Sequence, residues 1–350
     1  MSKTRCPEGL VYVGPQEEGF ARIRRGRGFS YHDATGKKIT DDDILARIKS
    51  LGIPPAWKDV WISQNPKGHL QATGYDLKNR KQYRYHPEWT EYRQLAKFSK
   101  LRDFGLKIPG IRFQTYQLLK QHGWPKEKVL ALVIQMLDEY HIRIGNEYYK
   151  EHNETFGLTT MRRKHLDFEK GVGGRLEYKA KSGKYRKISL HHNQLAKLVK
   201  ECSELPGYEI FTYRDENNKF QSIDSHDVNA FLHELAGEQF SSKDFRTWGG
   251  TTLLIEKEEE AREAVSENKR LKLETSLVRA VASSLGNTVS ICRNYYIHPE
   301  VMKHVMAGEV SDYLQKSPSG IKKNEHKLFR KSEIAVLNIL EDCDSKMPTF

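Results

Sequence analysis

The 350-residue sequence predicts an α+β protein with a small β-rich N-terminal domain and a larger, mainly α-helical domain that carries one β-hairpin. Three observations lead to this prediction. Short alternating segments joined by turn residues occupy the region before about residue 90, apolar residues at helical spacing follow it, and alternating segments return around residues 166–190. We expect boundaries at 1–90 and 91–310, with residues 311–350 forming a basic C-terminal extension.

The strands of the N-terminal domain are predicted from residues 59–86. DVWISQ and HLQATGYD are joined by the turn NPKG, and LKNRK leads into QYRYH. One helix is expected earlier, in TDDDILARIKSLG, with Thr40 as its N-cap, acidic residues in its first turn and Gly52 as its end.

The helical domain is clearest after Pro125, a residue that suits the first position of a helix. A single apolar face then recurs with the helical period, formed by Val129, Leu132, Val133, Met136, Leu137 and Tyr140. The hairpin is expected from RLEYKA and KYRKISL, which Ser182-Gly183 separates. Helices resume in SHDVNAFLHELAG and in LKLETSLVRAVASSLG, where Gly286 is the expected C-terminal cap.

Composition indicates the partner. Lys+Arg number 58 and Asp+Glu 46, a formal net charge of +12, and nucleic acid is the partner that this surplus favours. An anionic membrane is the rival, but no apolar run is long enough to span one, and the N-terminus lacks the apolar core of a signal peptide.

The four cysteines are scattered, which suits reduced thiols in an intracellular protein. We find no Walker A motif, no HExxH and no cluster of Cys and His ligands, so we expect neither a metal site nor a cofactor.

Three cationic positions stand out. Arg143 continues the apolar face of the helix that begins near Pro125, where a charge needs a partner, although a snorkelling or ion-paired arginine is the alternative. Arg246 lies near a predicted helix N-terminus together with Lys243, in an arrangement that favours an anion; a solvated charged turn is the alternative. Lys181 lies at the hairpin tip, where five cations occur in nine residues, and a simple phosphate contact would also explain it.

Two further candidates lie near the end of the helical domain. Asn287 directly follows the expected cap Gly286, and Tyr296 falls on the next helix, where packing is the alternative role. Phosphoryl transfer without a metal needs cations for the phosphorane oxygens, a nucleophile such as a phenol, and a general acid for the leaving alkoxide. The chain offers Arg, Lys, Arg, Asn and Tyr in this order.

The order and local motifs of these residues resemble the type IB DNA topoisomerases of the compact poxvirus and bacterial kind, over roughly residues 8–310. The resemblance implies that Arg143 in HIRIGNEYY and Arg246 in KDFRTWGG are the two catalytic arginines, and that Lys181 is the hairpin lysine. Asn287 in LGNTVSICRNYY takes a position that is His in many relatives and Asn in others. The nucleophile of the family follows that position by nine residues, which selects Tyr296.

The resemblance also implies that the partner is double-stranded DNA and that further residues bind it. Lys243 matches a phosphate-contacting lysine, and Gln82, Tyr83 and Tyr85 match positions that read the DNA site in the viral enzymes. Where the family commonly has a Gly-Lys pair at the hairpin, this chain has Ala180 before its lysine.

The activity implied is ATP-independent relaxation of supercoiled DNA through a 3′-phosphotyrosyl intermediate, by an enzyme that acts as a monomer without an obligatory metal. Its expected location is cytoplasmic, on the nucleoid, or in a virion if the source is viral. A tyrosine recombinase and a non-catalytic, basic DNA-binding protein are the alternatives. The box KDFR, with Lys243 where recombinases normally have His, and the β-rich N-terminal domain both favour the topoisomerase.

Overall fold

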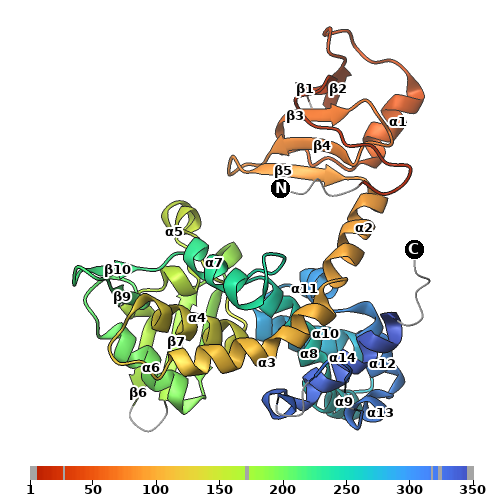
Figure 1. Cartoon of the computed structure of the whole chain (residues 1–350). Coiled ribbons are helices and arrows are strands. Elements are labelled where there is room, and N and C mark those ends of the chain that lie inside the picture. Colours follow the sequence, from red (N-terminus) through yellow and green to blue (C-terminus); the bar gives the residue numbers. More distant parts are fainter. Residues whose placement is uncertain (1–5, 27, 170–172, 317, 322–324, 345–350) are drawn as a thin grey trace. The chain divides into compact units, whose positions relative to one another are not determined.

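The computed structural model describes residues 6–344 except 27, 170–172, 317 and 322–324. The chain forms two compact units, residues 1–97 and 98–350. The first unit is dominated by strands and the second by helices, so the expected α+β class is confirmed (Figure 1). The division falls a few residues later than we expected from the sequence, because helix α2 (Pro87–Phe98) follows the last strand and ends at the division.

Unit 1 contains one antiparallel sheet with the strand order β2-β1-β3-β4-β5. The strands are β1 (Gly19–Arg25), β2 (Gly28–His32), β3 (Lys58–Ser63), β4 (Leu70–Tyr75) and β5 (Lys81–Tyr85). Helix α1 (Asp42–Ser50) packs against this sheet through Ile48, which lies in one apolar cluster with Phe20 and Ile62. The N-cap of α1 is Asp41 rather than the expected Thr40, because the Asp41 carboxylate accepts a hydrogen bond from the backbone N–H of Ile44 at 3.0 Å.

The described residues of unit 2 surround one apolar core, to which its helices and the strands β7 and β8 contribute. The helices are α3 (Leu101–Leu118), α4 (Lys126–Tyr140), α5 (Glu147–Asn153), α6 (Asn193–Ser203), α7 (Ser225–Ala236), α8 (Asp244–Glu256), α9 (Glu258–Glu267), α10 (Leu273–Leu285), α11 (Val289–Tyr296), α12 (Pro299–Ala307), α13 (Val310–Leu314) and α14 (Lys331–Asp344). Short 3-10 helices lie at Leu158–Thr160, Arg163–His165, Lys181–Gly183 and His326–Leu328.

Strands in unit 2 form two small antiparallel sheets. The expected hairpin is present as β7 (Gly173–Lys179) and β8 (Tyr185–Leu190), and β6 (Leu166–Glu169) extends it to the order β6-β7-β8. This sheet contacts α6, which in turn packs on α4 (Figure 1). A second pair is formed by β9 (Thr212–Arg214) and β10 (Phe220–Ser222).

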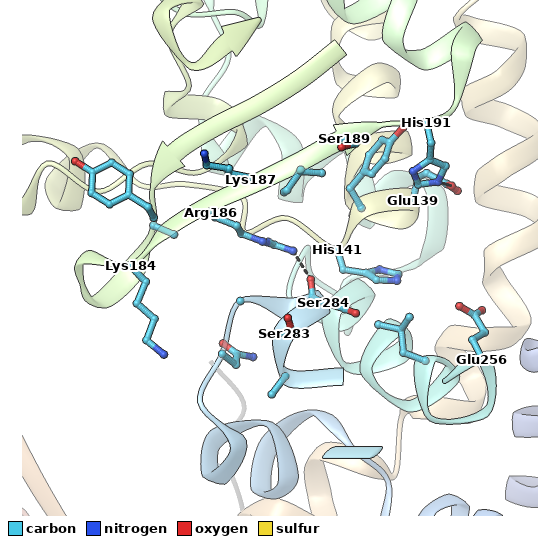
Figure 2. A pocket seen from close by; sticks show the side chains of 18 of the residues that line it. Glu139, His141, Lys184, Arg186, Lys187, Ser189, His191, Glu256, Ser283 and Ser284 are labelled. Carbon is cyan, nitrogen blue, oxygen red and sulfur yellow. Dashed lines mark hydrogen bonds and ion pairs between the residues drawn. The ribbon is translucent and has the colours of Figure 1, made fainter. Parts of the chain in front are cut away.

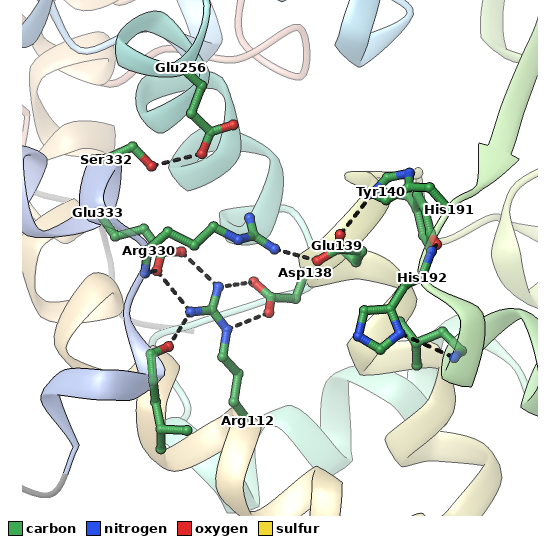
Figure 3. Close-up of polar contacts among 12 residues, drawn as sticks. Arg112, Asp138, Glu139, Tyr140, His191, His192, Glu256, Arg330, Ser332 and Glu333 are labelled. Atoms are coloured by element: carbon green, nitrogen blue, oxygen red, sulfur yellow. Dashed lines mark hydrogen bonds and ion pairs between the residues drawn. The ribbon is translucent and has the colours of Figure 1, made fainter.

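The C-terminal segment does not form a separate extension, in contrast to our expectation from its basic composition. Helix α14 packs against α3, α8, α12 and α13, and its residues from Ser332 to Leu340 are all buried. Arg112 of α3 fixes α14 in place, since its guanidinium donates to both carboxylate oxygens of Glu333 at 2.7 and 2.8 Å and to both of Asp138 at 2.7 and 3.0 Å (Figure 3). Trp248 of α8 also donates to Glu333, at 3.1 Å. Helices α3, α4, α8 and α14 therefore share one buried polar network, and they form the frame on which the candidate site is built.

Candidate active site

Arg246 lies in the first turn of α8 and is 3% exposed. Its Nη2 donates to the backbone carbonyl of Leu285 at 2.9 Å, and its Nη1 donates to the backbone carbonyl of His141. Leu285 is the last residue of α10, and His141 caps α4 in a left-handed conformation with φ 50°. The carbonyl ends of two helices carry partial negative charge, so they stabilise this buried guanidinium without neutralising it. Burial, followed by the nearby charge of Arg143, lowers the pKa of Arg246 to about 10, which leaves it charged at neutral pH.

Tyr296 is the last residue of α11, and its ring centroid lies 5.1 Å from the Cζ atom of Arg246. Burial alone would raise the pKa of this phenol. The adjacent Arg246 guanidinium and the charges of Arg143 and Lys243 outweigh that effect and hold the pKa of Tyr296 below its ordinary value. The phenolate is the nucleophilic form, so the surroundings of Tyr296 favour attack on an electrophilic phosphorus.

Two glycines let α8 approach this site closely. A Cβ atom on Gly250 would lie 2.5 Å from the carbonyl oxygen of Tyr296, and one on Gly249 would lie 2.3 Å from Cε1 of His141. Thr251 then donates from Oγ1 to the Tyr296 carbonyl at 3.3 Å. The Gly-Gly pair that follows Arg246 therefore sets the distance between α8 and the tyrosine.

Arg143 and Asn287 form the other side of the cluster. Arg143 lies in the loop after α4, and its guanidinium donates to Oδ1 of Asn287 and, at 3.5 Å, to the carbonyl of Gly286. Gly286 caps α10 with φ 61°, as expected, and this turn places Asn287 beside the arginine. The Nδ2 of Asn287 is buried and has no hydrogen-bond partner among the described residues. Asn287 therefore offers a neutral donor to a ligand next to two guanidiniums.

The charge balance of this cluster is unusual for a buried site. Within the described ranges, neither Arg143 nor Arg246 forms an ion pair with a carboxylate. Two half-buried or buried cations that only neutral groups compensate will attract an anion strongly, and paired guanidiniums match the oxygen geometry of a phosphate.

Lys181 lies at the hairpin tip, in the 3-10 turn between β7 and β8. The turn is closed by a hydrogen bond from the N–H of Gly183 to the carbonyl of Ala180 at 3.0 Å. The lysine is exposed, whereas the other four candidates are half-buried or buried. The structure thus groups Arg143, Arg246, Asn287 and Tyr296 and leaves Lys181 on a neighbouring projecting loop.

The residues expected to contact DNA lie in different units. Gln82, Tyr83 and Tyr85 lie on β5 of unit 1, where the two tyrosine rings stack at 5.9 Å and are 47% and 45% exposed. Gln82 donates to Asp76 at 3.0 Å. Lys243 lies in unit 2, exposed at the residue before α8. Exposed stacked aromatics are suited to contacts with bases or sugars.

Arg186 is a cation of this region that our sequence reasoning did not single out. It lies on β8 and is 9% exposed, and its Nη2 donates to the carbonyl of Ser284 near the end of α10. A signal was present, because strand alternation in YRKISL puts residue 186 on the same face as Ile188 and Leu190. A cation at an inward position of a strand is the observation that could have identified it.

The described residues hold no group of three or more His, Cys, Asp and Glu side chains placed to bind a metal ion. In the same part of the chain, no helix combines the length and the apolar character that crossing a membrane requires.

A phenol, two guanidiniums and an amide donor around one point define a class of site, in which a tyrosine can attack a phosphodiester that arginines hold. Comparison with known proteins identifies the family. The model of the eukaryotic DNA topoisomerase I catalytic core matches residues 86–325, and that of the bacterial DNA topoisomerase IB N-terminal domain matches residues 28–76. DNA topoisomerase 1B of Acanthamoeba polyphaga mimivirus is 31% identical over 291 residues, which cover 80% of this chain and 85% of that protein. The chain belongs to the type IB DNA topoisomerases, and our identification from the sequence is confirmed.

Proposed function

We propose that this protein relaxes supercoiled DNA by cutting and resealing one strand, with Tyr296 as the nucleophile. The observation that carries the proposal is the position of Tyr296 beside Arg246, where nearby cations hold the pKa of the phenol below its ordinary value. A phenol in this setting forms its reactive anion more readily than an exposed tyrosine does.

In the proposed reaction, the Tyr296 oxygen attacks the phosphorus of a backbone phosphodiester. A P–O bond forms to the tyrosine while the bond to the 5′-oxygen breaks, which leaves a 3′-phosphotyrosyl linkage. Arg143 and Arg246 bind the non-bridging oxygens, where negative charge develops in the transition state, and the free Nδ2 of Asn287 donates a further hydrogen bond. Lys181 donates a proton to the departing 5′-oxygen.

Resealing is the reverse of cleavage. After the strand rotates, the 5′-hydroxyl attacks the phosphotyrosine, returns its proton to Lys181 and releases Tyr296. One phosphodiester is exchanged for another of similar energy, so the cycle needs no ATP. The arginines supply the charge stabilisation that a metal ion supplies in other phosphoryl-transfer enzymes, so we also propose that no metal is obligatory.

The experiment is relaxation of negatively supercoiled plasmid in EDTA without ATP, with the wild type, Tyr296→Phe and Tyr295→Phe in parallel. Tyr295 is the matched control, since it is the adjacent tyrosine and is 43% exposed. We expect relaxation by the wild type and by Tyr295→Phe, and none by Tyr296→Phe. Activity of Tyr296→Phe together with loss in Tyr295→Phe would refute the assignment of the nucleophile.

Binding to DNA is proposed to use the net charge of +12 together with Lys243 on the phosphates and Gln82, Tyr83 and Tyr85 on the target sequence. Replacing Lys243 with Gln should weaken binding to all sequences alike, whereas Tyr83→Ala should change the pattern of cleavage sites along a DNA fragment. If Tyr83→Ala instead weakens binding to all sequences alike, as Lys243→Gln should, Tyr83 contacts the DNA backbone and not the bases.

We propose that the active form is a monomer bound to DNA on a nucleoid or in a virion, since one chain carries all five candidate residues. Analytical ultracentrifugation of the enzyme on a short duplex tests the stoichiometry. Cleavage that requires two chains on one duplex would contradict this proposal.

A further inference from the structure

Arg186 joins two segments that meet at the candidate site. It extends from β8 to the C-terminus of α10, where it donates to the carbonyl of Ser284 (Figure 2). The side chain also lies against Gly286, because a Cβ atom on that glycine would be 3.1 Å from Cδ and 3.2 Å from Nε of Arg186. Strand β8 thus contacts the turn that presents Asn287.

Burying the Arg186 guanidinium costs free energy that a purely structural role does not explain. The side chain is 9% exposed, forms no ion pair with a carboxylate in the described part of the chain, and has a buried Nη1 that lacks a partner there. It lines a cavity of about 760 Å³ that Lys184, Gly286 and Asn287 also line. A buried cation with an unsatisfied donor destabilises the fold, so its presence requires an explanation.

The position of Arg186 in the sequence explains why this cation is buried here. Lys181 lies in the turn that leads directly into β8, and Asn287 follows Gly286. Arg186 therefore forms a contact between the strand that follows the lysine-bearing turn and the asparagine-bearing turn. Burial is the main cause that lowers the pKa of Arg143 and of Arg246, and the charge of Arg186 adds to this lowering in both.

We propose that Arg186 is a positioning residue, which fixes the hairpin so that Lys181 reaches the 5′-oxygen of the cleaved strand. This inference rests on the proposed role of Lys181 as general acid. We assign Arg186 to the contact between β8 and the Gly286 turn and not to the phosphate, since Arg246, Arg143 and Lys243 are the cations that act on Tyr296.

The test compares two DNA substrates that differ in one atom. A sulfur at the 5′-bridging position leaves as a thiolate, whose conjugate acid has a pKa of about 8.5, so it departs without a general acid. The variants are Arg186→Met, Arg186→Lys and Lys181→Ala. Lys187→Met is the matched control, since Lys187 is the neighbouring cation on β8, with a side chain 67% exposed and paired to Glu177 at 3.2 Å. The measurement is the single-turnover rate of covalent adduct formation.

With the oxygen substrate, we expect Arg186→Met to slow cleavage by about 100-fold, because a misplaced general acid loses most of its effect. With the sulfur substrate, Arg186→Met and Lys181→Ala should both return to within about 3-fold of the wild type. Lys187→Met should keep the sulfur-to-oxygen rate ratio of the wild type. If thermal unfolding shows that Arg186→Met does not fold, the same comparison is made with Arg186→Lys, which retains the positive charge and an N–H donor group.

Two results would overturn the inference. An equal defect of the Arg186 variants on both substrates, with Lys181→Ala still rescued by sulfur, would make Arg186 a structural residue and leave the proposed function intact. Failure of sulfur to rescue Lys181→Ala would remove the general acid that Arg186 is said to position. Absence of any adduct with the wild type would instead refute the proposed function.

Discussion

Replacing Arg246 with Lys tests how the fold holds its most buried cation. The guanidinium donates to two carbonyls that lie at the ends of different helices, those of His141 and Leu285, and its Cζ lies 5.1 Å from the ring of Tyr296. A lysine keeps the charge but places it at a single point, so it cannot reproduce the planar fork. One carbonyl is then left buried without a donor, and the phosphate loses one of its paired hydrogen bonds.

The two losses have separate magnitudes. An unsatisfied buried acceptor costs about 1–3 kcal/mol of the free energy of unfolding, which corresponds to about 2–4 °C in Tm for each kcal/mol. Loss of one hydrogen bond to the developing charge costs about 2.7–4 kcal/mol in the transition state, or about 10²–10³-fold in the cleavage rate. Arg246→Lys should therefore reduce the rate far more than the loss of stability explains.

The assay is single-turnover cleavage of a duplex whose short 5′ product dissociates, combined with thermal unfolding of the same preparations. We expect a rate lower by about 10²–10³-fold at a temperature where the variant is fully folded. A rate within about 3-fold of the wild type would refute the reasoning, because it would mean that the fork of Arg246 contributes nothing in the transition state.

Three further predictions concern other parts of unit 2. Because the cations hold the pKa of Tyr296 below about 10, the cleavage rate should rise with pH and level off below that value. Arg143→Gln removes a charge that favours the phenolate, so it should move the pH at which the rate levels off to a higher value. An unchanged pH profile of this variant would contradict the prediction. Glu333→Gln should lower the free energy of unfolding by about 3–5 kcal/mol in chemical denaturation, and a loss below 1 kcal/mol would show that the network is dispensable. Gly286 and Gly308 both adopt positive φ, 61° and 76°, so replacing either with Ala should lower the free energy of unfolding by about 1–2 kcal/mol. Only Gly286→Ala should also slow cleavage, and Gly308→Ala is its control.

The candidate residues could be predicted from the sequence because each lies in a short local motif. The Gly286 cap before Asn287 and the tyrosine on the next helix are properties of neighbouring residues. We expected Arg143 on the apolar face of the helix that begins near Pro125, but α4 ends at Tyr140 and His141 caps it in a left-handed conformation, so Arg143 lies in the loop that follows. The local interactions that form helices and caps are encoded in such neighbourhoods, so the placement of Asn287 and Tyr296 on their elements followed directly.

Contacts between distant residues were not predictable in the same way. Arg112 and Glu333 are 221 positions apart, and the basic composition that led us to expect a C-terminal extension at residues 311–350 does not report that Glu333 meets Arg112 in the core. The two carbonyls that hold Arg246 belong to helices whose meeting depends on the whole fold, and one of them requires the left-handed conformation of His141. Pairing of this kind is set by tertiary packing, which periodicity does not report.

The most direct test of the account is to identify the residue that becomes covalently bound to DNA. The wild type is incubated with a supercoiled plasmid in EDTA, denatured during the reaction and digested, and the nucleotide-bearing peptide is sequenced by mass spectrometry. We predict a 3′-phosphate ester on Tyr296, with a 5′-hydroxyl on the other side of the nick. An ester on Tyr295, a 5′-phosphate linkage or relaxed plasmid without any protein–DNA adduct would contradict it.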